Sequence, residues 1–180
     1  MRSFSVLAAA CAFVVLALGA SAALAQGRPI VNLLSNRCID VPGQPGTAQG
    51  TALQLWDCET RGRSMNGAIT DQRWEWVNNG FIRNVLSGLC LDVQGEPGTA
   101  NGSRLILAKC EFNGRSPHGQ PTDQMWFTRA DGAIVNQYSM KCIDVSGAPG
   151  TTNGARLQVW DCETSGRNPN GSLTDQRWRF

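Results

Sequence analysis

The sequence predicts an all-β protein built from three copies of one unit. Segments 30–76, 82–128 and 134–180 (copy 1, copy 2 and copy 3) align without a gap at a constant offset of 52 residues. Twenty glycines and eight prolines are spread along the chain, and no apolar stripe at helical spacing occurs after the first 25 residues. Since a unit of about 50 residues does not bury its apolar face alone, we expect the copies to close into a compact threefold object.

Within each copy, short strands separated by turns are expected. In segment 51–56, and in the matching 155–160, the apolar residues alternate with others, so that Leu53 and Leu55 lie on one face. This period of two is typical of a strand with one buried face. Strands at such spacing predict a barrel or a sandwich. Three copies are too few for most propellers, but by this argument alone a threefold β-prism remains open.

Residues 1–25 have the composition of a secretory signal peptide. Arg2 precedes an apolar run from Val6 to Leu18, and small residues lead to Ala25, after which we expect cleavage. The run is too short for a transmembrane helix, and no later segment is longer. We therefore expect an exported domain of residues 26–180 with no membrane insertion.

Charge and cysteine content narrow the function classes. The net charge is +2, and Lys109 and Lys141 are the only lysines, so no polycationic surface for nucleic acid is expected. With Cys11 inside the predicted signal peptide, six cysteines remain, and an even set in an exported chain predicts disulfides. Six cysteines permit fifteen connectivities. Their equal spacing favours pairing within each copy: Cys38–Cys58, Cys90–Cys110 and Cys142–Cys162.

No metal, cofactor or catalytic constellation is predicted. Cys-x-x-Cys is absent and His118 is the only histidine, which disfavours zinc. His118 also has no counterpart in copies 1 and 3, so a Ser/His/Asp arrangement has no symmetric support. The pair Asp40 and Asp71 would suit a glycosidase in principle, but triplicated carboxylates fit binding better than chemistry. We expect no enzyme activity.

The repeated motif resembles that of the ricin-type lectins. Each copy has Cys-x-Asp near its start and Gln-x-Trp at its end, and copies 1 and 3 have a further Gln-x-Trp-x-Cys. The motifs are Cys38-Ile39-Asp40, Cys90-Leu91-Asp92 and Cys142-Ile143-Asp144, with Gln72-Arg73-Trp74, Gln124-Met125-Trp126 and Gln176-Arg177-Trp178. The resemblance covers residues 30–180 and implies a β-trefoil, a secreted lectin that is not an enzyme, and galactose-like glycans as partners. We expect Trp74, Trp126 and Trp178 to be core residues.

The candidate sugar-binding residues combine an aromatic ring with polar groups. A sugar presents a C–H patch, which suits an indole, and hydroxyls, which suit carboxylates and amides. The candidates are Asp40, Gln54, Trp56, Asp71 and Gln72 in copy 1, and Asp144, Gln158, Trp160, Asp175 and Gln176 in copy 3. The resemblance implies that Asp40 and Asp144 bind hydroxyls, that Trp56 and Trp160 stack on the ring, and that Gln72 and Gln176 support the aspartates.

Copy 2 departs from this set, because Ile106-Leu107-Ala108 replaces Gln-x-Trp. Without an aromatic residue, we expect its site to be silent or very weak and the protein to have two sugar sites. All copies also carry Asp where the family usually has Asn: Asp71, Asp123 and Asp175. Paired carboxylates repel unless a hydroxyl, an arginine or a cation lies between them. The recurring Arg63, Arg115 and Arg167 are candidates for this neutralising role.

One alternative comes from another function class. The same scaffold is compatible with a structural or protein-interaction trefoil, either an inhibitor or the docking subunit of a secreted complex. Sugar binding that depends on Trp56 and Trp160 discriminates between the two hypotheses.

Overall fold

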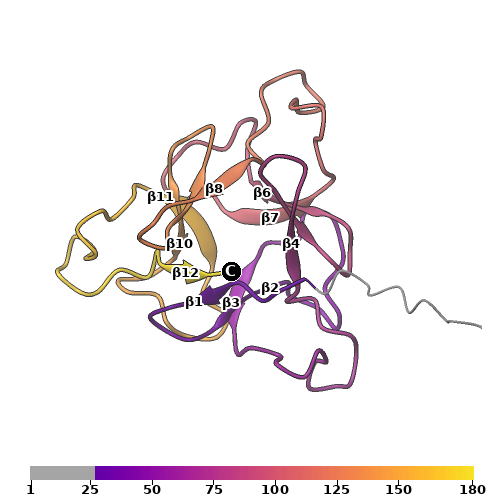
Figure 1. Ribbon diagram of the computed structural model, residues 1–180, viewed down its shortest axis with the longest axis horizontal. Coiled ribbons are helices and arrows are strands. Elements are labelled where there is room, and N and C mark those ends of the chain that lie inside the picture. Colours follow the sequence, from indigo (N-terminus) through magenta and orange to yellow (C-terminus); the bar gives the residue numbers. More distant parts are fainter. Residues whose placement is uncertain (1–26) are drawn as a thin grey trace, which may run out of the picture.

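The computed structural model describes residues 27–180, so the predicted signal peptide lies outside the described residues. Within them, the chain forms twelve short strands in three four-stranded antiparallel sheets arranged around a central axis (Figure 1). The strands are β1 (Val31–Asn32), β2 (Cys38–Asp40), β3 (Gln54–Trp56), β4 (Trp74–Val77), β5 (Phe81–Asn84), β6 (Cys90–Val93), β7 (Leu105–Ala108), β8 (Trp126–Thr128), β9 (Ile134–Asn136), β10 (Cys142–Val145), β11 (Leu157–Trp160) and β12 (Trp178–Arg179). In this part of the chain no helix is long and apolar enough to span a membrane.

The sheets close on one another through contacts between copies. Their strand orders are β12-β1-β2-β3, β4-β5-β6-β7 and β11-β10-β9-β8, and β12 returns to pair with β1. Three further bridges join the inner strands of different copies: Ala52 with Ile106, Gln54 with Arg156, and Arg104 with Gln158. Every copy is thus bridged to both others, which closes a barrel with threefold symmetry. This arrangement is a β-trefoil, as the motif resemblance implied.

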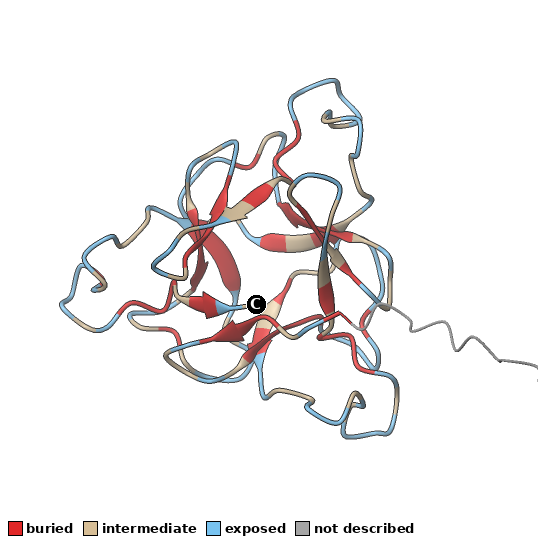
Figure 2. Ribbon diagram, in the orientation of Figure 1, coloured by how far each residue is buried: buried red, intermediate tan, exposed pale blue. Residues whose placement is uncertain are grey.

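The core lies on the axis and takes the same six positions from each copy (Figure 2). In copy 1 these are Ile30, Ile39, Val41, Leu53, Leu55 and Trp74, all buried. The prediction that the closing tryptophans are core residues is confirmed. Each donates its indole Nε1–H to a backbone carbonyl, Trp74 to Ile39 at 3.2 Å, so its polar atom is satisfied on burial.

The structure confirms the predicted alternation and disulfides and shortens one predicted strand. The alternation in segment 51–56 is confirmed, since Leu53 and Leu55 are buried while Trp56 is exposed. However, β3 covers only Gln54–Trp56, because Ala52 bridges to copy 2 instead of continuing the hairpin with β2. The three predicted disulfides are all present: Cys38–Cys58, Cys90–Cys110 and Cys142–Cys162.

Candidate functional site

The register of β2 and β3 brings the candidate residues of copy 1 together. Asp40 lies opposite Gln54, and Cys38 lies opposite Trp56. Because side chains alternate across a strand, these residues share the face that points away from the core. β10 and β11 repeat the register in copy 3, with Asp144 opposite Gln158 and Cys142 opposite Trp160.

Two glutamine amides hold each aspartate. In copy 1, Gln54 Nε2 donates to Asp40 Oδ2 at 2.7 Å, and Gln72 Nε2 donates to Asp40 Oδ1 at 2.9 Å. In copy 3 the corresponding distances from Gln158 and Gln176 to Asp144 are 2.8 and 3.0 Å. Donors to both oxygens fix the orientation of a carboxylate before any ligand arrives.

Gln72 holds Asp40 in position and is itself held by the backbone. It is buried, and its Oε1 accepts the backbone N–H of Glu59 at 2.8 Å. That bond ties the segment after the second cysteine to Asp40, which agrees with the supporting role that the resemblance implied. Gln124 and Gln176 make the same contacts in the other copies, with Glu111 and Glu163.

The aspartate before each closing Gln-x-Trp holds a turn. Asp71 Oδ2 accepts the backbone N–H of Gly46 at 2.7 Å, beneath the Pro-Gly turn that follows β2. No side chain is tolerated at Gly46, because an added Cβ would lie 2.3 Å from the Val41 carbonyl oxygen. Asp123 and Asp175 bind Gly98 and Gly150 in the same way, at 2.5 and 2.7 Å. The contact explains why copy 2 keeps this aspartate although it lacks the indole.

Burial and mutual repulsion change the acidity of these carboxyl groups. Burial raises the pKa of Asp71 to about 7, and the neighbouring Asp40 adds to the increase. In copy 3, burial and then the charge of Asp144 raise the pKa of Asp175 to about 7. Burial also raises the pKa of Asp144, the partner of Asp175 in copy 3.

The recurring arginines do not neutralise the carboxylates, contrary to the sequence-based suggestion. Arg63 Nη1 donates to the carbonyl of Gly67, four residues further on, at 2.7 Å. Arg115 and Arg167 close the same local turn, with Gly119 and Gly171, at 2.8 and 2.7 Å. The short separation explains the error: the arginines hydrogen-bond within the long loops that project from the three corners of Figure 1.

The two indoles lie at the protein surface beside hollows. Trp56 and Trp160 are each 37% exposed, which is high for tryptophan in a small domain. In copy 3, Trp160, Asp144 and Gln158 line a single cleft of about 380 Å³. In copy 1, Trp56 lines a hollow of about 500 Å³ together with Arg61 and Asn153, whereas Asp40 and Gln54 do not line it.

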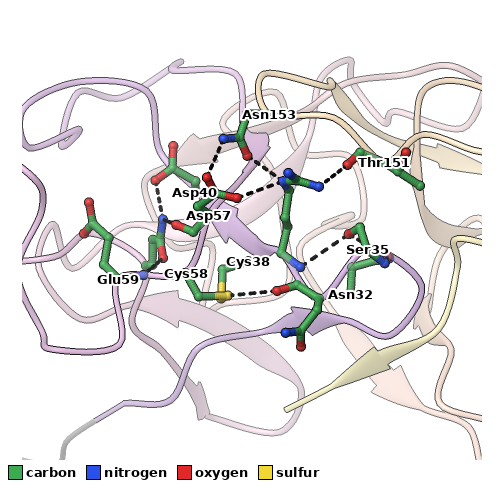
Figure 3. A network of polar contacts seen from close by, with 12 residues as sticks. Asn32, Ser35, Cys38, Asp40, Asp57, Cys58, Glu59, Thr151 and Asn153 are labelled. Atoms are coloured by element: carbon green, nitrogen blue, oxygen red, sulfur yellow. Dashed lines mark hydrogen bonds and ion pairs between the residues drawn. A yellow bond between two sulfur atoms is a disulfide. The ribbon is translucent and has the colours of Figure 1, made fainter.

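A polar network between copies, which the sequence analysis missed, includes the aspartate that follows each indole; Figure 3 shows the network of copy 1. Asn153 of copy 3 donates its Nδ2 to Asp57 Oδ2 at 2.8 Å, and Asp57 directly follows Trp56. Arg37 Nε completes the network, at 3.0 Å from Asp57 Oδ1 and 2.7 Å from Asn153 Oδ1. In copy 3 the same network consists of Asn101 from copy 2, Asp161 and Lys141.

Copy 2 has lost this network together with the indole. Leu89, Lys109 and Gln49 stand where copy 1 has Arg37, Asp57 and Asn153, or their equivalents. The sequence already shows that copy 2 differs from copies 1 and 3 at all three positions. Only the fold shows that these three positions lie together. Copy 2 lacks the indole at Ala108, as the sequence showed, but its cleft has an aromatic residue from another position: Phe112, which corresponds to Thr60 and Thr164.

All ten predicted sugar-site residues therefore gather at two equivalent places. Asp40, Gln54 and Trp56 share one face of a hairpin; the Trp56 ring is exposed, whereas Asp40 is buried, as are Gln72 and Asp71. Within residues 27–180, no three acidic, histidine or cysteine side chains are grouped closely enough to hold a metal ion. The class of protein is thus a disulfide-linked β-trefoil that presents indole–carboxylate pairs.

Comparison with known proteins identifies the family. The domain model of the ricin-type beta-trefoil lectins matches residues 26–180, and the chain belongs to this family. A galactose/N-acetylgalactosamine-binding lectin, CEL-III of Pseudocnus echinatus, is 29% identical over 141 residues, which are 73% of this chain and 28% of that lectin. Serine protease 1 of Rarobacter faecitabidus is 31% identical over 155 residues, 80% of this chain and 22% of the protease. The chain thus spans less than a third of either relative.

Solved structures agree on the fold. The crystal structure of the hemolytic lectin CEL-III superimposes with a TM-score of 0.61 at 29% identity, covering 86% of this chain and 29% of that one. The designed threefold-symmetric protein ThreeFoil superimposes with a TM-score of 0.62 at 22% identity, covering 84% of this chain and 94% of the design.

Proposed function

We propose that this protein is a secreted, non-enzymatic lectin with two sugar sites, one in copy 1 and one in copy 3. The observation that carries the proposal is an exposed indole on the same sheet face as an aspartate that two glutamine amides hold in place. The indole receives the C–H face of a sugar, and the free lone pairs of the aspartate accept hydroxyl protons. Gln72 positions this pair through its bonds to Asp40 and to the Glu59 backbone, and Asp71 supports the turn at Gly46.

The ligand class follows from the family and from one relative. CEL-III, 29% identical, is by name a galactose/N-acetylgalactosamine-binding lectin. We therefore assign galactose-type sugars to copies 1 and 3. Two sites on one rigid body permit simultaneous binding to clustered glycans, so the protein is expected to agglutinate glycan-bearing surfaces more strongly than either site binds a monosaccharide. Secretion is supported by the three disulfides, which persist in oxidising compartments.

Calorimetric titration with N-acetylgalactosamine tests the proposal. We expect a stoichiometry near two for the native chain, near one for Trp56→Ala or Trp160→Ala, and none for the double variant. Ala108 in copy 2 shows that the fold accepts a small residue at this position, so the variants should remain folded. Three equivalent sites, or full binding by the double variant, would contradict the proposal. If the double variant still bound the sugar fully and also bound a protein partner, the docking-subunit alternative would be favoured.

A glycan array on residues 26–180 identifies the preferred sugar. An assay for reducing-end release from the oligosaccharides that bind tests the absence of enzyme activity. Release that disappears on replacement of Asp40 or Asp144 by Asn would contradict a purely binding function.

A further inference from the structure

Copy 2 lacks the sugar-site pattern of the other copies but still contains a large cleft. The cleft has a volume of about 740 Å³, nearly twice that of its equivalent in copy 3, and lies between the Glu96-Pro97 turn and the long loop after Cys110. This volume is within the range of small-molecule sites. We call it the copy-2 cleft; its lining includes Asp92, Ile106, Ala108, Glu111 and Phe112.

The floor and one wall of the copy-2 cleft are apolar. Ile106 and Ala108 on β7 replace the glutamine and the indole of the other copies. Phe112 replaces a threonine, is 47% exposed, and contacts Phe81 edge to face with the ring centres 5.2 Å apart. That contact holds the Phe112 ring in place at the wall of the cleft.

One carboxylate oxygen of Asp92, which lines the copy-2 cleft, has no hydrogen-bond partner in the described chain. Asp92 is 8% exposed and accepts one bond, from Gln124 Nε2 to Oδ2 at 2.6 Å. In copies 1 and 3 a second glutamine bonds the other oxygen, but its position in copy 2 is taken by Ile106. Asp92 Oδ1 therefore has no partner within residues 27–180, and Asp92 lines the cleft.

Asp92, Glu111 and Asp123, which line the cleft, form no ion pair within residues 27–180. Lys109 and Arg115 also line it, but across the described chain neither forms an ion pair with Asp92, Glu111 or Asp123. Glu96 pairs with His118 at the mouth, at 3.3 Å. Burial, followed by the charge of Asp123, raises the pKa of Asp92 to about 7, as expected of a carboxyl group that lacks a cation.

We propose that the copy-2 cleft binds an organic ammonium group carried on a short apolar chain. Asp92 Oδ1 and Glu111 accept charge-assisted hydrogen bonds from the ammonium, and the face of Phe112 attracts it through its π electrons. The methylene groups of the ligand cover Ile106 and Ala108. A sugar suits this cleft poorly, because its hydroxyls would lose water against these two apolar side chains without new partners. The site is chemically distinct from the sugar sites of copies 1 and 3.

Nuclear magnetic resonance of the isotope-labelled chain tests the proposal. Butylammonium should produce saturable chemical-shift changes at Ala108 and Phe112, and neutral 1-butanol should not. Nα-acetyl-lysine methylamide distinguishes the source: saturation of the same signals identifies a lysine side chain of a partner, and a response to butylammonium alone identifies a free amine. The proposal would be overturned if butylammonium caused no saturable change or if 1-butanol had an equal effect. It would also be overturned if calcium ions displaced the amine, or if galactose shifted the signals of these residues.

Three single substitutions test the contribution of individual side chains to butylammonium binding. Phe112→Thr restores the residue of the other copies at an exposed position and should weaken butylammonium binding about threefold. Ile106→Gln restores the second amide donor to Asp92 and should weaken binding about tenfold or more. Glu111→Gln removes one carboxylate and leaves the backbone bond from Glu111 to Gln124 intact. All three should retain two sugar sites, which separates this proposal from the proposed lectin function. Unchanged butylammonium affinity in all three would overturn it.

Discussion

Asn153 donates a hydrogen bond of 2.8 Å to Asp57 although 96 residues separate the two along the chain. Asp57 directly follows Trp56, and Asn153 of copy 3 lines the same hollow as this exposed indole of copy 1. Asn101 of copy 2 stands in the same relation to Asp161 and Trp160, at 2.8 Å. The aspartate after each of the two indoles is therefore hydrogen-bonded to another copy, and we expect closure of the trefoil to support binding as well as stability.

This relation predicts that removing the asparagine weakens sugar binding without unfolding the protein. Asn153→Ala should lower the affinity of the copy 1 site about threefold, since the network is exposed to solvent and such contacts contribute little individually. The copy 3 site should be unaffected. Calorimetry on the Trp160→Ala background isolates the copy 1 site. Gln49→Ala, at the matching position beside copy 2, is the control, and equal effects of both variants would refute the positioning role.

Gln72 is expected to matter for both stability and binding, and Gln124 for stability alone. Each fills buried hydrogen bonds to an aspartate and to a backbone N–H. Replacement by Ala leaves these groups unpaired and should cost about 2 kcal/mol of unfolding free energy in either copy. Only Gln72→Ala should also reduce the sugar stoichiometry, because Asp40 then loses its orientation. Urea unfolding and titration measure the two effects, and loss of sugar binding in Gln124→Ala would contradict the assignment.

Stability should fall as the pH rises from about 4 to about 7. In the folded state Asp71, Asp92 and Asp175 have pKa values near 7, against an ordinary value of 3.8. Between these values the folded protein binds more protons than the unfolded chain, so unfolding becomes easier as protons are removed. Thermal unfolding from pH 4 to pH 8 measures the slope. A melting temperature that rises over this interval would contradict the raised pKa values.

The Asp71→Asn substitution separates the charge of this residue from its hydrogen bond. The amide oxygen of asparagine still accepts the Gly46 N–H but carries no charge to repel Asp40. We expect the variant to be more stable than the native chain at pH 8, by about 1–3 kcal/mol, and to differ little at pH 4. Asp123→Asn is the matched control, with a smaller gain, because the pKa of Asp123 is raised only to about 6. Destabilisation of Asp71→Asn at both pH values would show that the carboxyl group itself is required.

Loss of the copy 2 disulfide should affect stability and leave sugar binding intact. Replacing Cys90 and Cys110 by Ala opens a closed loop with a sequence separation of 20, at a cost of about 3 kcal/mol. The corresponding change at Cys38 and Cys58 should have a similar cost but should also weaken binding, because Cys38 lies opposite Trp56. Thermal unfolding and titration measure both, and equal sugar affinities in the two variants would count against this difference.

Most of the fold was predictable from local and periodic patterns. The gapless repeat placed equivalent residues in equivalent positions, so the alternation around Leu53 and the spacing of the cysteines predicted the buried faces and the disulfides. The bond from Gln54 to Asp40 was not predicted, although both residues were candidates, because it depends on the register of β2 and β3. Arg63 was misassigned because a recurring charge in a sequence does not show which partner it reaches, and its partner is the nearby Gly67 carbonyl.

The sequence by itself determined the threefold architecture, the cross-links and the two places where an indole accompanies an acid, since these depend on spacing within one repeat. Only the tertiary structure decided that Asp71 supports a turn, that Asn153 reaches Asp57, and that Phe112 faces the copy-2 cleft. These relations join segments through the closed barrel and the long loops, where distance in space has no fixed connection to distance along the chain.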